Sequence, residues 1–339
     1  MEFEQIVDEN LKKYGWWANY AYHFTDVTNA VSILQSERLY SRINASEFMK
    51  NDNASSHVLD FTKYSTMSYV RFYFRPLTPT QYYNEGYKHF QLRYDNDLNA
   101  NITVPIFFVF NLKNLLKNSS IKFSNFSQAG DGSQLFQGID DFATKMEFDK
   151  IYSDGAAQDT VRKYRHAEIL YPTEYNICDS LEFVICRNEV EKNTLLNLLL
   201  SSAPRMYYKY KDKIRISKEK MYEYNGLFLE NISFDKNMFS ATFAQTYAKK
   251  RYDEKMMAKN NMQKLEPVTV LVNLEWKNNS SVLMEKQLKY IIDYLQPPRI
   301  VCKNLPNTKN AKEITVSIYT DGKLSGTAKF KLEDTEILK

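Results

Sequence analysis

The sequence predicts an α+β fold built from two parts, and three observations lead to this prediction. At 339 residues the chain exceeds one typical domain, and its hydrophobic fraction of 43% is enough for a packed core. Short strands and helices alternate as far as Ser201-Ser202-Ala203-Pro204, where the pattern changes to a run of strands. Residues 1–204 carry 20 Lys+Arg against 25 Asp+Glu, whereas residues 205–339 carry 25 against 16. We therefore expect one domain over residues 1–204 and a basic, mainly β, sandwich-like domain over residues 205–339.

The first part has clear local signals for strands, caps and helices. Residues 22–25 alternate as a short strand, and Asp26 or Thr28 can cap the helix that follows. Residues 40–68 are polar and too long for an ordinary connection, which is typical of functional or disordered loops. Asn188, with Glu191 three residues later, fits a capping box for a Leu-rich helix ending near Leu200. The pattern also predicts strands at residues 69–75, 104–110, 165–171 and 181–187, a short helix at 111–117 and a loop at 130–138.

The second part is dominated by strand patterns separated by Asn, Asp and Gly turns. Asp321-Gly322 marks a hairpin. We expect strands at residues 228–234, 239–247, 268–274, 312–319 and 326–332, and one helix near residues 282–294. The basic excess of this part suggests contact with a polyanion, although solubility alone also explains it.

Several classes of chemistry are disfavoured by what the sequence lacks. The dinucleotide-binding, P-loop, zinc-protease and nucleophile-elbow motifs are absent, and nine glycines leave little room for a phosphate-cradling loop. Four histidines without ligand spacing argue against a metal. Three scattered cysteines predict a reducing, cytoplasmic location, and neither a membrane span nor a signal peptide is expected.

The most unusual stretch is the predicted strand that begins at Tyr69 and ends at a proline turn. Period-two alternation places Val70 and Phe72 on one face and Arg71, between Tyr69 and Tyr73, on the other. Guanidinium pairs with phosphate and aromatic rings stack on planar ligands, so this face suits an anionic, planar ligand. An edge strand with one solvated face is the alternative.

Two further strands carry polar residues in apolar surroundings. His23 lies in the strand of residues 22–25, where a histidine is more often structural. Glu168 lies in the middle of the apolar residues 165–172, and a glutamate there is costly to bury unless it is paired or functional. A cross-strand ion pair with an arginine is its structural alternative.

A histidine on an early strand, aromatics on a second and a glutamate on a late one resemble the pattern of ADP-ribosyltransferases. More narrowly, the sequence resembles the DarT family of ADP-ribosyltransferase toxins that modify nucleic-acid bases. Three blocks carry the resemblance: residues 22–34 with Tyr-His-Phe-Thr and Asn-Ala-Val-Ser-Ile-Leu, residues 69–83, and Arg-His-Ala-Glu-Ile-Leu at residues 165–170. The resemblance covers about residues 20–200 and implies a split β-sheet core, NAD as co-substrate and no metal.

The resemblance also assigns roles to residues. Glu168 matches the catalytic glutamate that positions the ribose. The family has a catalytic arginine upstream of the aromatic strand, for which Arg42 is the candidate and Arg71 the rival. The cofactor is expected to contact residues of the first two blocks, namely His23, Thr25, Tyr73, Arg75 and Tyr82.

One departure concerns the loop in which the family has a histidine. Here the corresponding residues are Phe123-Ser124-Asn125-Phe126-Ser127-Gln128, so the contact to the target base is not inherited from the resemblance.

Two stretches of the second part interleave aromatics with cations, as single-strand binding needs. Lys209, Lys211 and Lys213 are the candidates in residues 206–215, and residues 249–252, Lys-Lys-Arg-Tyr, repeat the pattern. A solvated linker is the alternative for the first stretch.

The leading hypothesis is a toxin that transfers ADP-ribose from NAD to a base of single-stranded DNA or mRNA. The resemblance implies a cognate antitoxin, within a toxin–antitoxin or phage-defence system. The alternatives are an ADP-ribosyltransferase that acts on protein and an inactive nucleic-acid-binding module.

Overall fold

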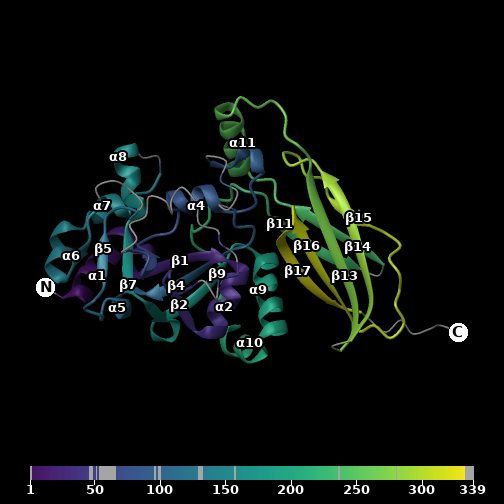
Figure 1. The fold of residues 1–339 in the computed structure, drawn as a ribbon, viewed down its shortest axis with the longest axis horizontal. Helices are drawn as coiled ribbons and strands as arrows, with labels where there is room; N and C mark the ends of the chain where they lie inside the picture. The colour runs from purple at the N-terminus through teal and green to yellow at the C-terminus, as the bar shows by residue number, and fades with distance from the viewer. Residues whose placement is uncertain are drawn as a thin grey trace.

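The computed structural model describes residues 2–45, 49–50, 52, 66–94, 97, 101–128, 133–155, 158–235, 237–279 and 281–332. Figure 1 shows a mixed part of helices and strands beside a taller part made mainly of strands, with helix α9 between them. The predicted α+β class with a mainly β second part is confirmed.

The first part contains an eight-stranded sheet in the order β10-β9-β4-β1-β3-β7-β5-β6. A small second sheet pairs β2 (Arg38–Tyr40) with β8 (Glu174–Asn176). The strands of the large sheet are β1 (Tyr20–Asp26), β3 (Tyr69–Tyr73), β4 (Pro105–Asn111), β5 (Lys122–Ser124), β6 (Phe136–Gln137), β7 (Glu168–Pro172), β9 (Leu181–Cys186) and β10 (Ile214–Ile216).

The large sheet is split between β1 and β3. Strand β1 pairs with β4 along its whole length, from Tyr20 to Asp26. Its register with β3 holds one pair, Tyr22 with Tyr73, whereas β3 pairs with β7 over five residues. Two half-sheets therefore meet at a single residue pair, which confirms the predicted split.

The helices pack around this sheet, and their caps explain where they begin. Asp26 accepts hydrogen bonds from the backbone N–H and the hydroxyl of Thr28, so it is the predicted cap of α2 (Val27–Ser36). The other helices of the first part are α1 (Phe3–Tyr14), α4 (Pro79–Asn84), α5 (Leu112–Leu115), α6 (Ile139–Lys145), α7 (Phe148–Ile151), α8 (Asp159–Arg162), α9 (Glu189–Ser202) and α10 (Pro204–Tyr210). Short 3₁₀ helices are η1 (Trp16–Asn19), η3 (Phe90–Leu92), η5 (Lys163–His166) and η6 (Ile177–Asp179).

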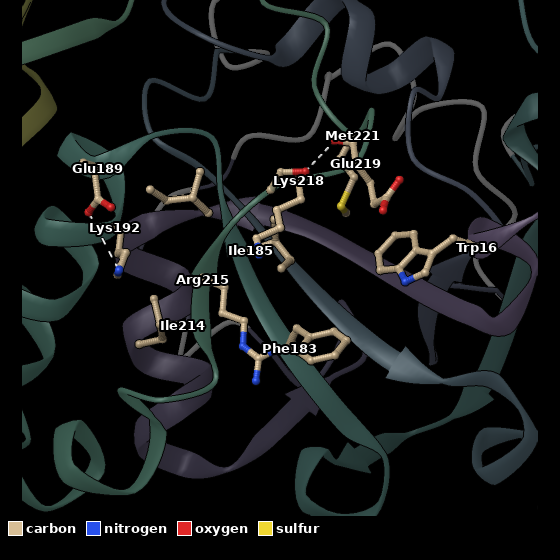
Figure 2. A pocket seen from close by; sticks show the side chains of 12 residues that line it. Trp16, Phe183, Ile185, Glu189, Lys192, Ile214, Arg215, Lys218, Glu219 and Met221 are labelled. Carbon is tan, nitrogen blue, oxygen red and sulfur yellow. Dashed lines mark hydrogen bonds and ion pairs between the residues drawn. The ribbon is translucent and has the colours of Figure 1, made fainter.

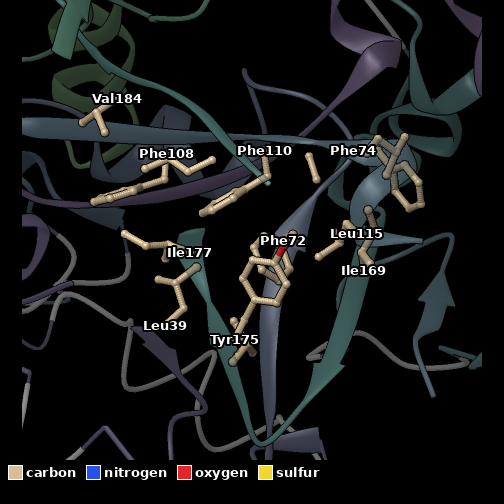
Figure 3. Close-up of a cluster of buried hydrophobic side chains, with 14 of the residues drawn as sticks. Leu39, Phe72, Phe74, Phe108, Phe110, Leu115, Ile169, Tyr175, Ile177 and Val184 are labelled. Carbon is tan, nitrogen blue, oxygen red and sulfur yellow. The ribbon is translucent and has the colours of Figure 1, made fainter. Parts of the chain in front are cut away.

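The apolar face of β3 is buried in the main core, as its alternation predicts. Val70 and Phe72 are buried, while Tyr69, Arg71 and Tyr73 are half-buried. Phe72 makes edge contacts to Phe110 and Tyr175, with ring centroids 5.2 and 5.4 Å apart (Figure 3).

The second part is formed by two antiparallel sheets that share one core. One holds β11 (Leu229–Asp235), β12 (Met238–Phe243) and β15 (Ile300–Cys302), in the order β11-β12-β15. The other has the order β14-β13-β16-β17, with β13 (Val268–Asn278), β14 (Ser281–Ile292), β16 (Glu313–Thr320) and β17 (Lys323–Lys331). Leu229, Phe239 and Val270 belong to the same buried cluster, so the sheets face each other across it.

Three predicted elements of the chain are wrong. The helix expected near residues 282–294 is strand β14, because this segment pairs with the whole of β13 in a long hairpin. The strand expected to reach residue 247 ends at Phe243. Helix α11 (Tyr247–Lys259) begins at residue 247, where the Thr246 hydroxyl caps it. The strand expected from residue 165 begins at Glu168, because Lys163–His166 form a 3₁₀ helix.

The expected boundary at residue 204 stays a prediction. Helix α10 follows α9 directly, and β10 then pairs in parallel with β9 in the sheet of the first part. The polar segment of residues 40–68 lies largely outside the described residues, as do residues 130–132 of the loop expected at 130–138.

A buried ionic cluster joins the two parts. Arg187, at the end of β9, contacts Glu85 at 3.3 Å and also pairs with Glu191 of α9. The Glu85 carboxylate accepts hydrogen bonds from the backbone N–H groups of Glu223 (2.8 Å) and Tyr224 (2.9 Å). The side chains of Arg187, Glu85 and Glu191 are 0–2% exposed, so one cation is shared by two carboxylates away from water, and the two N–H groups add support to Glu85.

The backbones of the two parts also touch beside this cluster. Tyr87 and Leu227 form an isolated β-bridge, and each donates a backbone N–H to the other at 2.9 Å. Lys88 donates from Nζ to Asn225 Oδ1 at 2.6 Å. The segment after α4 therefore holds the start of the second part.

Among the described helices, no segment has both the length and the apolar character that a membrane crossing requires.

We expect Arg187→Met to destabilise the protein by about 3–5 kcal/mol, because it leaves two buried carboxylates without their shared cation. Urea unfolding measures this loss. Arg38→Met is the matched control, since Arg38 pairs with Glu174 on the surface and such pairs contribute about 0–1 kcal/mol. Equal losses of unfolding free energy in the two variants would contradict the role of Arg187 in joining the two parts.

Candidate active site

The candidate site lies where β1 and β3 diverge and β7 begins. Glu168 is the first residue of β7 and pairs in register with Tyr73 of β3 and Ser124 of β5. Glu168 is 1% exposed. Its carboxylate accepts the backbone N–H of Gln128 at 3.4 Å and lies 3.8 Å from Arg71 Nη1. The ion pair that the sequence offers as an alternative is therefore present, and Gln128 adds a second contact.

Burial controls the ionisation of this glutamate. Loss of solvent raises the pKa of Glu168 above its ordinary value, while the nearby Arg71 guanidinium and the Gln128 N–H act in the opposite direction. Burial thus disfavours the ionised form of Glu168, and the Arg71 guanidinium partly stabilises it.

Arg71 connects the glutamate to the histidine of β1. Its guanidinium Nη2 lies 3.3 Å from Thr66 Oγ1, and its side chain is one-quarter exposed. Its carbonyl oxygen accepts a hydrogen bond from His23 Nδ1 at 3.1 Å. Because a carbonyl only accepts, Nδ1 carries the proton, and Nε2 of the neutral ring is an acceptor. Burial lowers the pKa of His23, which favours this neutral form.

Tyr73 adds an aromatic ring and a hydroxyl beside Glu168. Burial and the Glu168 charge raise the pKa of Tyr73 to about 12, while a hydrogen bond with Thr80 lowers it. Thr80 Oγ1 also lies 3.4 Å from His166 Nδ1, and burial lowers the pKa of His166 to about 4. Thr80, His166 and Gln128 are site neighbours that the sequence analysis did not assign a role.

Two other candidates, Arg75 just after β3 and Thr25 on β1, are buried. Arg75 is 1% exposed, and its guanidinium donates to the carbonyl oxygens of Pro76 (2.9 Å), Ile151 (3.1 Å) and Ser153. It also lies over the Trp17 ring, 4.5 Å from the centroid. Thr25 is buried in β1 opposite Ile106 of β4.

Tyr82 faces another part of the molecule. It lies on α4, and its ring packs against Tyr83 and Tyr252 at centroid distances of 5.1 and 5.4 Å. The described contacts therefore place it beside α11 rather than beside the Glu168 carboxylate.

Arg42 follows β2, and its guanidinium forms a forked ion pair with Asp52 (2.5 and 3.2 Å). Most of the chain between Arg42 and Thr66 lies outside the described residues. The described contacts therefore connect Arg71, and not Arg42, to Glu168.

The three candidate lysines lie on or after α10. Lys209 pairs with Glu37, and Lys213 Nζ donates to the carbonyl oxygen of Leu181 at 2.6 Å. Lys211 lies over the Tyr208 ring at 5.9 Å. Two of the three cations therefore contact residues that precede α9, Glu37 and Leu181.

A hollow of about 700 Å³ lies next to this region, along β9 and β10 (Figure 2). Its lining includes the Trp16 and Phe183 rings, and the Arg215 guanidinium lies 4.6 Å from the Phe183 centroid. Arg215 ends the stretch that the sequence singled out, whereas Trp16 and Phe183 could be found only from the fold.

The cluster of Glu168, Arg71, His23 and Tyr73 fits a defined chemistry. A buried carboxylate stabilises positive charge that develops on a sugar carbon, and a guanidinium binds phosphate oxygens. The tyrosine ring provides a stacking surface, and the neutral imidazole provides a hydrogen-bond acceptor. A nucleotide-sugar donor whose glycosidic bond breaks through a cationic state suits these four groups.

Comparisons with known proteins point to the same chemistry. A family model described as "DarT: ssDNA thymidine ADP-ribosyltransferase, DarT" matches residues 22–222. No curated protein matches the chain.

Among solved structures, the chain is similar to Thermus sp. 2.9 DarT in complex with ADP-ribosylated ssDNA (TM-score 0.49, 15% identity, 60% of this chain and 96% of that one). The same protein in complex with NAD+ gives a TM-score of 0.47 at 15% identity, over 60% and 97% of the two chains. Thermosipho africanus DarTG in complex with ADP-ribose gives 0.44 at 14% identity, over 65% and 54%. These TM-scores are low, so the family match is the stronger finding.

The raised pKa of Glu168 predicts a pH-dependent stability difference between the wild type and Glu168→Gln. A raised pKa stabilises the fold below the ordinary value of 4.5, and this contribution is lost as the pH rises through the folded-state pKa. Since glutamine mimics the protonated carboxyl, the wild type should lose stability relative to Glu168→Gln with increasing pH. Urea unfolding from acid to neutral pH measures the difference.

Arg71→Gln should move this loss to higher pH, because it removes the guanidinium that lowers the pKa of Glu168. A wild type that gains stability over Glu168→Gln as the pH rises would contradict the assignment.

Proposed function

Because the chain belongs to the DarT family, whose members are NAD-dependent ADP-ribosyltransferases, we propose that it transfers ADP-ribose from NAD to a base of single-stranded DNA. The observation that supports this function best is the convergence of Glu168, Arg71, His23 and Tyr73 at the split between the half-sheets. The family description favours DNA, and thymidine as the nucleoside, over the RNA that the sequence left open.

The proposed reaction is a single exchange at the anomeric carbon of the ribose. The bond to the nicotinamide nitrogen breaks, its electron pair leaves with nicotinamide, and a ring nitrogen of the base forms the new bond. Glu168 stabilises the cationic ribose through its negative charge, so its ionised form is the active one. Arg71 lies between Glu168 and His23 and is suited to hold the pyrophosphate, and Tyr73 is suited to stack on the nicotinamide.

The attacking base must also lose its proton. The resemblance assigns this step, or the orientation of the base, to an arginine, and we propose Arg42 for it, with Arg71 as the rival. Thr25, Arg75 and Tyr82 stay candidates for cofactor contact. The buried guanidinium of Arg75, which donates to three carbonyl oxygens, also supports a role in positioning the segment after α7.

The wider context is part of the proposal. We propose a cytoplasmic toxin restrained by a cognate antitoxin, in toxin–antitoxin or antiviral defence; the support is the family relation. Lys209, Lys211 and Lys213 stay candidates for nucleic-acid binding. We also propose that the catalytic part continues past residue 204, because β10 joins its sheet and the family match runs to residue 222.

The central prediction concerns transfer of label. With adenine-labelled NAD and three acceptors, namely single-stranded DNA, single-stranded RNA and lysate protein, we expect label on the DNA. Glu168→Ala should lower the rate about 100- to 1,000-fold, because it removes the preorganised charge at the ribose. Electrophoresis of the labelled acceptors measures the rate.

Each other outcome selects a different function. Label on protein alone would support a protein-directed transferase, and label on RNA alone would replace the DNA substrate. DNA binding with intact NAD, unchanged by Glu168→Ala, would support the inactive binding module.

Kinetics can separate the two arginines. If Arg71 holds the pyrophosphate, Arg71→Ala should raise the KM for NAD about tenfold or more. If Arg42 acts on the base, Arg42→Ala should lower kcat about 100-fold with little change in that KM. Arg38→Ala is the matched control, because Arg38 is an ion-paired arginine at the start of β2. A kcat loss for Arg71→Ala with none for Arg42→Ala would give the base role to Arg71.

A further inference from the structure

Helix α11 of the second part docks on the segment of residues 82–94 in the first part. Tyr252 packs on the Tyr82 ring and donates its hydroxyl to the carbonyl oxygen of Leu92 at 3.2 Å. The side chain of Asn260 donates to the carbonyl oxygen of Gln91 at 2.9 Å. Figure 1 shows α11, α4 and α8 along the same upper rim of the molecule. The family match ends at residue 222, so α11 belongs to what this chain adds.

The inward face of α11 is fixed by burial. Lys249 pairs with Asp253 at 2.6 Å, and Tyr252 and Met256 are 1–2% exposed. Two of the four residues that the sequence grouped as a binding stretch, Lys249 and Tyr252, are therefore structural. The same helix geometry turns other cations outward.

Three of these cations form a stripe along α11. Arg251, Lys255 and Lys259 are exposed and recur every four residues, so they lie on one side of the helix. Lys255 Nζ lies 5.5 Å from the centroid of the Tyr82 ring, and Lys259 Nζ lies 4.5 Å from that of Tyr94. The stripe thus runs beside the aromatic segment that α11 covers.

The aromatic segment supplies three connected rings. The Tyr82 and Tyr83 centroids are 5.1 Å apart, and those of Tyr83 and Tyr94 are 4.6 Å apart. Tyr94 is 40% exposed. We call Tyr82, Tyr83, Tyr94, Arg251, Lys255 and Lys259 the α4–α11 surface.

Two of the carboxylates near this surface have their charge shared or reduced. Glu254 lies on the same helix and contacts Lys250 at 3.9 Å, so its charge is shared with a further cation. Burial raises the pKa of Glu223, which interacts with Tyr82, to about 7. On α11 itself, the exposed cations Lys250, Arg251, Lys255 and Lys259 outnumber the one exposed carboxylate, Glu254, so the helix surface beside the rings is positive.

The surface is continuous with the candidate site through α4. This helix carries Tyr82 and Tyr83, and it also carries Thr80, which contacts His166 and Tyr73. His166 is two residues before Glu168. Since α4 has six residues, its length is about 9 Å, so the rings begin within that distance of the Tyr73 neighbourhood.

We propose that the α4–α11 surface binds the single-stranded DNA that flanks the modified base, and this inference rests on the proposed function. Stacking rings alternating with cations are what sequence-tolerant single-strand binding requires: rings for the bases and cations for the phosphates. The basic second part then lengthens the DNA footprint beyond the family's catalytic part.

The test measures affinity without catalysis. Fluorescence anisotropy, in the absence of NAD, compares oligonucleotides of about 4 and about 20 nucleotides, since a single-strand groove spans roughly 4–16 nucleotides. Arg251→Gln combined with Lys255→Gln should weaken binding of the longer oligonucleotide about tenfold, with little effect on the shorter one. The slope of log K against log salt concentration should become shallower by about 1.4, because each lost phosphate contact contributes about 0.7 for single strands.

The matched control removes the same charge elsewhere in the second part. Lys286→Gln combined with Lys289→Gln changes two exposed lysines of β14 and should leave both affinities unchanged. Equal losses for the two double variants would overturn the proposal, because they would show a diffuse charge effect. An unchanged affinity of the Arg251/Lys255 variant would overturn it as well.

The rings are tested separately. Tyr94→Ala should weaken binding of the longer oligonucleotide about tenfold, whereas Tyr94→Phe should keep it, because the ring face stacks and the hydroxyl is not needed. A loss restricted to RNA of equal length would overturn DNA as the ligand. A wild type that binds DNA through this surface but transfers no ADP-ribose would contradict the proposed function and leave this inference standing.

Discussion

The guanidinium of Arg187 is the group on which the arrangement of both parts depends. It compensates two carboxylates, Glu85 and Glu191, in a region that water does not reach. Glu85 in turn accepts hydrogen bonds from the Gln81 side chain of α4 and from the backbone of the segment that leads to β11. One cation therefore fixes the end of α4 against β9, α9 and the beginning of the second part. Since α4 also carries Thr80 and Tyr82, the same cluster sets how the candidate site and helix α11 meet.

The split sheet solves a second physical problem. A continuous sheet would occupy the backbone groups of β1 and β3 with each other, whereas a single Tyr22–Tyr73 pair leaves His23 to donate to the Arg71 carbonyl across the divergence. The half-sheets remain anchored by their own partners, β4 for β1 and β7 for β3. Rigid strands thus present a carboxylate, a guanidinium and an imidazole at one place, and the cost of burying Glu168 is offset by Arg71 and Gln128.

Local patterns of the sequence were sufficient where a residue's neighbours in the chain decide its environment. The alternation of β3 and the Asp26 cap are such cases, and both are confirmed. The capping box of α9 was half right, because Asn188 caps the helix but the Glu191 carboxylate turns to Arg187 instead of the Asn188 N–H. Residues 282–294 have an apolar pattern that fits a helix or a strand, and pairing with β13 decided between them. The burial of Arg75 depends on carbonyl groups of residues 151 and 153, which no local pattern reveals.

The contact between Gly86 and Gly226 bears on how such a protein can be divided. A Cβ at Gly226 would lie 2.6 Å from the carbonyl oxygen of Glu85, and one at Gly86 would lie 2.8 Å from Gly226 Cα. Each position therefore requires a residue without a side chain because the other backbone is there. A part joined only by a free linker would place no such demand on its neighbour, so the added strands and the catalytic part are packed backbone against backbone. A truncation that keeps Gly86 and discards residues 226 and 227 would remove both the backbone against which Gly86 packs and the bridge partner of Tyr87.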